Sequence, residues 1–265
     1  MFTRVVRYRS IFQTGGTQEP IHNVDAVEFL ASLQEPPNLI LTDPPYGMSY
    51  RSNIPGDRRW NASGEPVNGR FDVLKGDAEG EIDMARFLSA CHSAMDEGFL
   101  VMFSGIKMFG RWSEMATAAG FELRTPGVWI KGCANGGDLT DPLISVCEMV
   151  ICARKGKPRS FSVRRNGEDK TRIPNYWNIG RVPKAEYCGH PTQKPLLICQ
   201  DMVEMFTSED GFVVDPFCGS GSSLVAAKMS GRRYAGTDVD AHYADLARDR
   251  LSRAGAPAEE KRNPQ

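Results

Sequence analysis

The chain has 265 residues, of which 41% are hydrophobic and 25% charged, and its formal net charge is −1. This composition is ordinary for a globular protein, and the length suits one large domain or a domain with one sizeable insertion. No stretch approaches the roughly 18 consecutive apolar residues of a membrane span, and residues 1–12 hold no apolar signal-peptide core. We therefore expect a cytoplasmic protein that has no membrane partner.

The cysteines argue against a metal site. Seven of them are scattered at positions 91, 133, 147, 152, 188, 199 and 218. None forms a CxxC pair, and no second pair of ligands accompanies Cys188-Gly189-His190. We expect reduced thiols that are mostly packed in the interior, and no bound metal.

Short apolar runs alternate along the chain with amphipathic patterns. The runs at 38–42, 98–104, 127–131, 147–153, 211–215 and 233–238 predict strands. The patterns at 24–34, 82–96, 107–119, 195–207, 222–230 and 240–253 predict helices. No internal repeat is visible. The alternation indicates an α/β fold, with a doubly wound and mostly parallel sheet in a single domain over residues 1–265.

The first predicted strand ends abruptly. The run 38–42 leads directly into Asp43-Pro44-Pro45-Tyr46. Proline lacks a backbone donor and fixes φ, so two prolines in succession cannot continue the strand. The strand therefore displays an acid and an aromatic side chain at its tip, where we expect a ligand.

Three segments do not fit the alternation. Residues 51–80 are rich in Gly, Asn, Pro and charge and indicate a long mobile loop, which in a compact domain is usually functional or disordered. Residues 154–190 indicate an insertion, and between 154 and 184 ten Lys and Arg stand against two Asp and Glu. Such a cluster is either a solvated basic face or a footprint for nucleic acid. Residues 254–265 are expected to be a disordered tail.

A glycine-rich turn follows the strand predicted at 211–215. The strand ends in Asp215, Gly219 and Gly221 turn the chain, and a helix begins near Ser222. Glycines let the backbone approach a ligand, and a helix N-terminus presents free N–H groups. The next strand ends in Asp238, at about the offset where a dinucleotide-type site places an acid on ribose hydroxyls. A purely structural turn is the alternative.

The details of this turn discriminate between nucleotide ligands. A phosphate-binding loop requires Lys followed by Ser or Thr after the last glycine, and Ser222-Ser223 stand there instead. The dinucleotide pattern requires a third glycine, and Leu224 occupies its place. Asp215 would repel a pyrophosphate but suits a cationic ligand. S-adenosylmethionine has both a positive charge and a ribose, and it is the cofactor that we expect.

The two motifs are expected to share one crevice. A βαβ unit that starts at residue 211 has too few strands to form a sheet alone and must join those of the N-terminal half. In an open parallel sheet, ligands bind beyond the carboxyl ends of the strands where the strand order reverses. We therefore expect Asp43 and Asp215 to face each other.

Three motifs together carry a family resemblance. Asp43-Pro44-Pro45-Tyr46, then residues 190–195 (HPTQKP), then residues 215–221 (DPFCGSG) resemble the permuted, beta-class amino-methyltransferases of DNA. These enzymes use S-adenosylmethionine to methylate adenine N6 or cytosine N4. The resemblance covers roughly residues 20–50 and 95–250. It implies a circularly permuted, Rossmann-like methyltransferase fold, with residues 154–190 as a small inserted target-recognition segment.

The resemblance implies a role for each matching residue. Asp43 and the Pro44 carbonyl would accept hydrogen bonds from the exocyclic amino group of the target base, and Tyr46 would stack on that base. Asp238 would hold the cofactor's ribose. The implied cofactor-binding residues are Asp25, Asp43, Thr192, Lys194, Asp215, Phe217, Gly219, Gly221 and Asp238. Within that set, Asp25 would contact the adenine, and Thr192 and Lys194 the methionine carboxylate. The DNA-binding candidates are Arg164, Arg165, Lys170, Arg172, Arg181 and Lys184.

The leading hypothesis is therefore a DNA methyltransferase that acts on adenine N6 of a flipped base in double-stranded DNA, at a short site of roughly 4–6 base pairs. Cytosine N4 is the alternative within the class, although its members tend to have serine where Asp43 stands. An RNA or protein-glutamine methyltransferase, and a catalytically silent DNA-binding module, are further alternatives. A homodimer and a cognate restriction endonuclease are partners that the sequence leaves open.

Overall fold

The computed structural model describes residues 20–46, 82–132, 145–159 and 172–255, together with the backbone of four short strands between these ranges. Those strands are β3 (Arg59–Trp60), β4 (Pro66–Val67), β9 (Val163–Arg165) and β10 (Glu168–Lys170), and they form two separate antiparallel pairs. Most of the loop predicted at 51–80 and nearly all of the tail predicted at 254–265 lie outside the described residues. Among the described helices, none is long and apolar enough to cross a membrane.

A single sheet organises the core, and its strand order is β1-β13-β12-β2-β5-β8-β7-β11. The strands, in that order, are Ile21–His22, Arg233–Thr237, Phe212–Asp215, Leu39–Thr42, Gly98–Ser104, Cys147–Lys155, Gly127–Ile130 and Tyr176–Asn178. All neighbours from β1 to β5 are parallel, whereas β8 runs antiparallel to both β5 and β7. A short strand, β6 (Glu122–Leu123), also pairs with β8.

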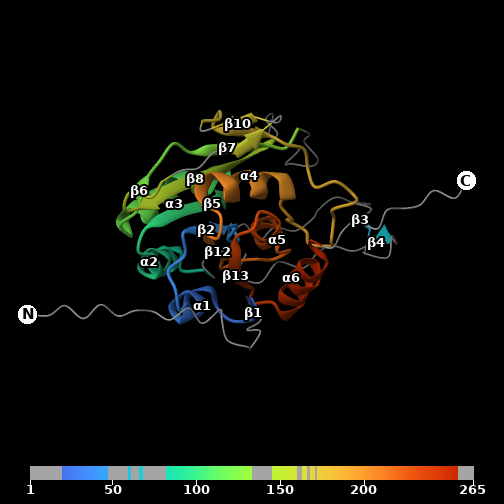
Figure 1. Cartoon of the computed structure of the whole chain (residues 1–265), viewed down its shortest axis with the longest axis horizontal. Coiled ribbons are helices and arrows are strands. Elements are labelled where there is room, and N and C mark those ends of the chain that lie inside the picture. The colour runs from blue at the N-terminus through green and yellow to red at the C-terminus, as the bar shows by residue number, and fades with distance from the viewer. Residues whose placement is uncertain are drawn as a thin grey trace, which may run out of the picture.

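Helices cover both faces of the sheet (Figure 1). The first face is packed by α1 (Ala26–Ser32), α2 (Met84–Ala94) and α3 (Ile106–Ala118), and the second by α4 (Leu196–Phe206) and α5 (Ser222–Met229). The last helix, α6 (Ala241–Arg253), packs on α5 beside β1. Alternate side chains of β2 explain the two layers, because Ile40 enters the first apolar cluster while Leu39 and Leu41 enter the second. The predicted doubly wound, mostly parallel α/β fold is confirmed.

The strand order reverses between β2 and β12. From β2 the chain passes through α2 to β5 on one side, and from β12 it passes through α5 to β13 on the other. The two strands are held in register by backbone pairing and by Asn38, whose Oδ1 accepts from the Phe212 N–H at 2.9 Å. Just past them, Thr42 Oγ1 donates to Asp215 Oδ1 at 2.8 Å. The prediction that Asp43 and Asp215 meet at one edge of the sheet is confirmed.

The segment at 154–190 differs in part from the predicted insertion. Its first two residues belong to β8, and residues 176–178 form β11 at the edge of the main sheet, parallel to β7. Trp177 anchors this strand to α4, because its indole is buried and its Nε1 donates to Asp201 Oδ2 at 3.1 Å. The segment therefore contributes to the core as well as to the surface.

Candidate active site

Asp43 lies one residue beyond β2, at the carboxyl edge of the sheet. Both of its carboxylate oxygens have partners: Tyr46 donates its hydroxyl to Oδ1 at 2.9 Å, and Lys194 donates its ammonium to Oδ2. The Tyr46 ring packs edge-on against Trp112 of α3, with 5.8 Å between the ring centroids. Pro44, which follows Asp43 in the sequence, is buried. The broken strand end thus presents a carboxylate whose orientation is fixed from two sides.

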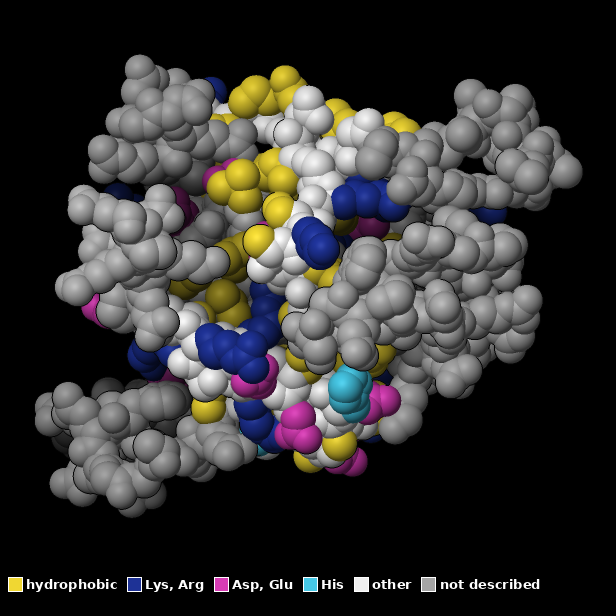
Figure 2. Space-filling model, turned by 90° about the vertical axis from the view of Figure 1, so that its right-hand side faces the viewer, with side chains coloured by type: hydrophobic (Ala, Val, Ile, Leu, Met, Phe, Trp, Pro, Cys, Tyr) yellow, Lys and Arg dark blue, Asp and Glu magenta, His cyan; other side chains and the backbone are white. Residues whose placement is uncertain are grey.

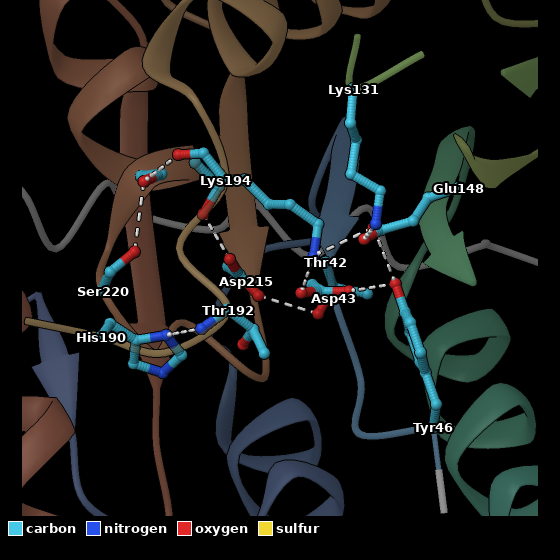
Figure 3. A network of polar contacts seen from close by, with 12 residues as sticks. Thr42, Asp43, Tyr46, Lys131, Glu148, His190, Thr192, Lys194, Asp215 and Ser220 are labelled. Carbon is cyan, nitrogen blue, oxygen red and sulfur yellow. Dashed lines mark hydrogen bonds and ion pairs between the residues drawn. The ribbon is translucent and has the colours of Figure 1, made fainter. Parts of the chain in front are cut away.

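Glu148, from the antiparallel strand β8, is a second carboxylate in this cluster (Figure 3). Its Oε1 accepts from Lys131 Nζ at 2.7 Å, and its Oε2 lies 3.1 Å from the Tyr46 hydroxyl, whose one hydrogen is shared between Glu148 and Asp43. Lys194 Nζ lies 3.4 Å from Oε2 and so bridges Asp43 and Glu148. Two carboxylates and two ammonium groups therefore form one compact, charge-balanced network.

Aromatic rings surround the ammonium of Lys194. Its Nζ lies 5.0 Å from the ring centroid of Phe103, 5.9 Å from that of Tyr46 and 6.0 Å from that of Trp129. The Trp129 indole is held in place because its Nε1 donates to the Ile179 carbonyl at 2.7 Å. The faces of such rings attract a cation. The cage therefore stabilises the charged form of Lys194.

Burial and charge act in opposite directions on this network. Desolvation raises the pKa of Asp43 above its usual value, and the neighbouring Glu148 adds to this effect while Lys194 opposes it. Desolvation alone would lower the pKa of Lys194, but the two carboxylates outweigh it and raise that pKa. The pKa of Glu148 is lowered, since Lys194 and Lys131 outweigh desolvation there. Lys194 is therefore charged at neutral pH.

Asp215, at the end of β12, sits beside this network and faces the glycine-rich turn. Three donors point to its carboxylate: the hydroxyls of Thr42 and Ser223, and the Phe217 N–H at 3.1 Å. Desolvation raises the pKa of Asp215 to about 7, although the three donors favour the charged form. The same carboxylate thus ties β2, the turn and the first residues of α5 together.

The turn itself requires its glycines. Gly219 and Gly221 have φ values of +46° and +73°, a region that other residues rarely adopt. A Cβ on Gly219 would lie 2.8 Å from Nε2 of His190, so the close approach of that imidazole also depends on the glycine. Gly221 precedes α5 and supplies no side-chain cap, which leaves N–H groups of the first turn available.

Two more carboxylates stand at the ends of β13 and β1. Asp238 accepts from the Gly219 N–H at 3.0 Å and from the Asp240 N–H at 2.9 Å. Asp25 caps α1 by accepting from the Val27 N–H at 2.8 Å. Because β1 and β13 are adjacent parallel strands, these acids follow neighbouring strand ends at the same edge of the sheet.

The segment 190–195 carries two predicted site residues, Thr192 and Lys194, and lies between the Asp43 network and the glycine-rich turn. His190 is buried, and its Nδ1 accepts from the Thr192 N–H at 3.3 Å. Desolvation lowers the pKa of His190 to about 3, so the imidazole is neutral and serves as a packing residue. Lys194 pairs with Asp43 and Glu148, and its expected contact with the cofactor's carboxylate stays a prediction. The Lys194 carbonyl accepts from Ser222 of α5 at 2.8 Å, which joins this segment to the glycine-rich turn.

The structure brings most of the predicted residues together. Phe217 packs edge-on against Phe87 of α2 below the turn, with 4.9 Å between the ring centroids. The predicted DNA-binding residues lie elsewhere on the chain. Arg164, Arg165 and Lys170 belong to the β9–β10 hairpin, of which the backbone alone is described, and the other three are exposed: Arg172, Arg181 and Lys184.

Sequence reasoning missed Glu148, Thr42 and Ser223. Glu148 did carry a signal, because it is a lone carboxylate at the start of the apolar run 147–153. Its partners could not be recognised, since they come from distant segments. Within the described ranges, no group of three or more His, Cys, Asp and Glu could hold a metal ion.

Comparison with known proteins identifies the family. A family model for DNA methylases matches residues 38–249, which is most of the chain. Type II methyltransferase M2.DpnII of Streptococcus pneumoniae is 26% identical over 242 residues, covering 86% of this chain and 87% of that protein. Type II methyltransferase M2.LlaDCHI of Lactococcus lactis subsp. cremoris is 32% identical over 113 residues, 40% of this chain and 42% of that one. The chain therefore belongs to the DNA methylase family.

Solved structures agree on the fold. The complex of M1.HpyAVI with SAM superposes with a TM-score of 0.66 at 19% identity, covering 88% of this chain and 98% of that chain. PvuII DNA methyltransferase, described as cytosine-N4-specific, gives a TM-score of 0.62 at 15% identity over 88% of this chain and 90% of that one. At these identities the likeness concerns the fold alone.

Proposed function

We propose that this protein transfers a methyl group from S-adenosylmethionine to N6 of adenine in double-stranded DNA. The observation that carries the proposal is the position of Asp43, Pro44 and Tyr46 at the strand-order reversal, directly beside Asp215 and the glycine-rich turn. In this proposal, Asp43 accepts from the target amino group and the adjacent glycine-rich turn binds the nucleoside of the cofactor. Membership of the DNA methylase family supports it.

The residues on the nucleoside side fit S-adenosylmethionine. Ribose hydroxyls need acceptors, which Asp238 offers, and Asp25 follows the adjacent strand. A cation suits Asp215 once its carboxylate is charged. The N–H groups at the start of α5 and the backbone at the two glycines suit a closely packed ligand. When bound, this cofactor supplies an electrophilic methyl group on a sulfonium.

The residues on the target side fit an aromatic amine. Its nitrogen is a poor nucleophile because its lone pair is delocalised into the ring. Acceptors for both N–H groups, which Asp43 and the Pro44 carbonyl would provide, favour a tetrahedral nitrogen whose lone pair points at the methyl group. Asp43 then acts by position and charge, which can contribute several kcal/mol. Tyr46 would stack on the flipped base and offset about 1–3 kcal/mol of the cost of flipping it.

The basic residues of the β9–β10 hairpin and of residues 172–184 are the proposed contacts to DNA. Arg164, Arg165 and Lys170 are carried by a short hairpin that stands apart from the main sheet. Described Lys and Arg side chains also gather near the middle of one face of the molecule (Figure 2). A recognition element of this size suits a short duplex site. A homodimer or a companion restriction endonuclease is compatible with this function but is not required by it.

Methylation of cytosine N4 is the second candidate. The likeness to the PvuII enzyme favours it, although that likeness concerns the fold. Both targets are amino groups on aromatic rings, so the same acceptors serve either reaction. Asp43 favours adenine, because the cytosine-N4 members that the sequence resembles tend to have serine at this position.

Asp43→Ala tests the catalytic assignment. We expect methyl transfer to DNA to be abolished while binding of S-adenosylmethionine, measured by calorimetry, survives. Asp249→Ala is the matched control, because it removes an exposed carboxylate that pairs with Arg253 at 2.6 Å on α6, and it should keep its activity. Retained turnover in Asp43→Ala would contradict the proposed role.

A further inference from the structure

We propose that Glu148 is a positioning residue that becomes the main acceptor for the Lys194 ammonium and the Tyr46 hydroxyl when Asp43 binds the target amino group. This inference rests on the proposed function of Asp43. Nothing in the family comparison assigns a role to Glu148, and it comes from the antiparallel strand β8 rather than from any of the three sequence motifs.

Both carboxylate oxygens of Asp43 already have a donor in this structure. One oxygen accepts from the Tyr46 hydroxyl at 2.9 Å, and the other accepts from the Lys194 ammonium. An exocyclic amino group that donates to Asp43 must displace at least one of these donors or share an oxygen with it. A buried ammonium cannot be released without a new partner, because an unpaired buried charge is costly.

Glu148 is already within reach of both donors. Its Oε2 lies 3.1 Å from the Tyr46 hydroxyl and 3.4 Å from Lys194 Nζ (Figure 3). A shift of Lys194 from Asp43 toward Glu148 would therefore exchange one ion pair for another within the same aromatic cage. The network would stay charge-balanced while an acceptor oxygen of Asp43 becomes available to the target.

Lys131 and the sheet keep Glu148 in position for this exchange. Lys131 Nζ donates to Oε1 at 2.7 Å, which leaves Oε2 for the exchanged donors. The backbone of Glu148 is opposite Trp129 in the β7–β8 ladder, so it belongs to regular sheet rather than to a loop. Its side chain is 15% exposed. Glu148 is thus a fixed acceptor beside the carboxylate whose partners change in this proposal.

The acid limb of the pH–rate profile gives a readout that a purely structural role would not move. Asp43 must be ionised to accept from the amine, and Glu148 contributes to raising the pKa of Asp43. Removal of the Glu148 charge should therefore lower that pKa and move the acid limb to lower pH. The titratable and charged groups that act on Asp43 or on its partners are Lys194, Glu148, Tyr46, Lys131 and Asp215.

The variant is Glu148→Gln, assayed for methyl transfer to duplex DNA from pH 5 to 9. We expect kcat to fall about 10- to 100-fold, as for the loss of one charge-assisted hydrogen bond, with the KM for S-adenosylmethionine unchanged and the acid limb at lower pH. Glu122→Gln is the matched control, because Glu122 of β6 is half exposed and pairs at 2.8 Å with Arg154, which lies on β8 as Glu148 does. It should keep the wild-type profile.

An acid limb that stays in place in Glu148→Gln, whatever the change in kcat or melting temperature, would overturn the inference. A second measurement uses the wild-type protein alone: its crystal structure with a substrate duplex and S-adenosylhomocysteine. We expect Lys194 Nζ to lie closer to Glu148 than to Asp43 there, and the opposite order with the target amine on Asp43 would overturn the inference. A wild-type enzyme that transfers no methyl group would overturn the proposed function as well.

Discussion

Replacement of Lys194 by methionine is the sharpest perturbation of the charged network. The substitution keeps most of the apolar stem but removes the ammonium that bridges Asp43 and Glu148. Two carboxylates would then share one partly buried site, with Lys131 as the neighbouring ammonium on Glu148. The expected consequences are a loss of folding stability and a new dependence of that stability on pH.

The magnitude follows from burial. Breaking a buried ion pair by removing one partner costs about 3–5 kcal/mol, because a charge is left uncompensated. Lys194 is 8% exposed, whereas Asp43 and Glu148 are 21% and 15% exposed, so solvent screens part of the repulsion. We therefore expect the low end, about 3 kcal/mol at pH 8. For a domain of this size that corresponds to a decrease of about 6 °C in melting temperature.

The pH dependence has a definite sign. In the wild type, the raised pKa of Lys194 means that its contribution is present at neutral pH and is lost only as pH rises through that raised pKa. In Lys194→Met, both carboxylates lose the counter-charge of Lys194, so the raised pKa of Asp43 rises further and the pKa of Glu148 is lowered less. The destabilisation is then present at pH 8 and diminishes as pH falls toward 5, where the carboxylates take up protons.

Urea unfolding of the wild type and of Lys194→Met at pH 8 and pH 5 measures the difference in their free energies of unfolding. Lys228→Met is the control, because the Lys228 ammonium donates to the Leu251 carbonyl at 2.7 Å rather than to a carboxylate, and its effect should not vary with pH. A Lys194→Met protein as stable as the wild type at pH 8, or equally destabilised at both pH values, would refute the bridging role of Lys194.

Two further predictions concern the turn and the basic hairpin. Gly221→Ala should lower the free energy of unfolding by about 1–3 kcal/mol, since φ is +73° and the new Cβ would lie 3.0 Å from that of Ala247. Gly110→Ala in α3 is the control: its new Cβ would meet no atom of another element within 4 Å, so it should raise the free energy of unfolding by up to about 1 kcal/mol. Equal effects of the two substitutions would contradict the account of the turn. Replacing both Arg164 and Arg165 with Gln should weaken DNA binding and reduce the salt slope by about 1 per lost phosphate contact. An unchanged slope in a filter-binding titration would remove the hairpin from the interface.

The main elements of the fold follow from local patterns in the sequence. The strand at 98–104 is a continuous apolar run because both faces of β5 are covered by helices, and the helices end where their amphipathic patterns end. Asp43 and Asp215 were placed at one edge by the rule on parallel strands, which needs no knowledge of packing. The end of the strand at Asp43 and the turn at Gly219 and Gly221 could also be predicted, because proline and glycine are local signals in the sequence.

Other features depended on contacts between distant segments. The strand at 176–178 is short and lies in a basic segment, and it is stabilised by burial of Trp177 against α4 rather than by any local pattern. Glu148 is brought to Asp43 because β8 inserts antiparallel between β5 and β7. The ion pair between Lys194 and Asp43 joins residues that are 151 positions apart in the sequence, so no local pattern predicts it.

The central claim is methyl transfer to adenine N6 of DNA, and the most direct measurement is the product itself. Duplex DNA is incubated with the protein and methyl-labelled S-adenosylmethionine, digested to nucleosides and separated by chromatography with mass detection. The account predicts that the label appears as N6-methyldeoxyadenosine. Label in N4-methyldeoxycytidine would contradict the choice of base, and DNA that remains unlabelled while it still binds the protein would contradict the catalytic role of the site.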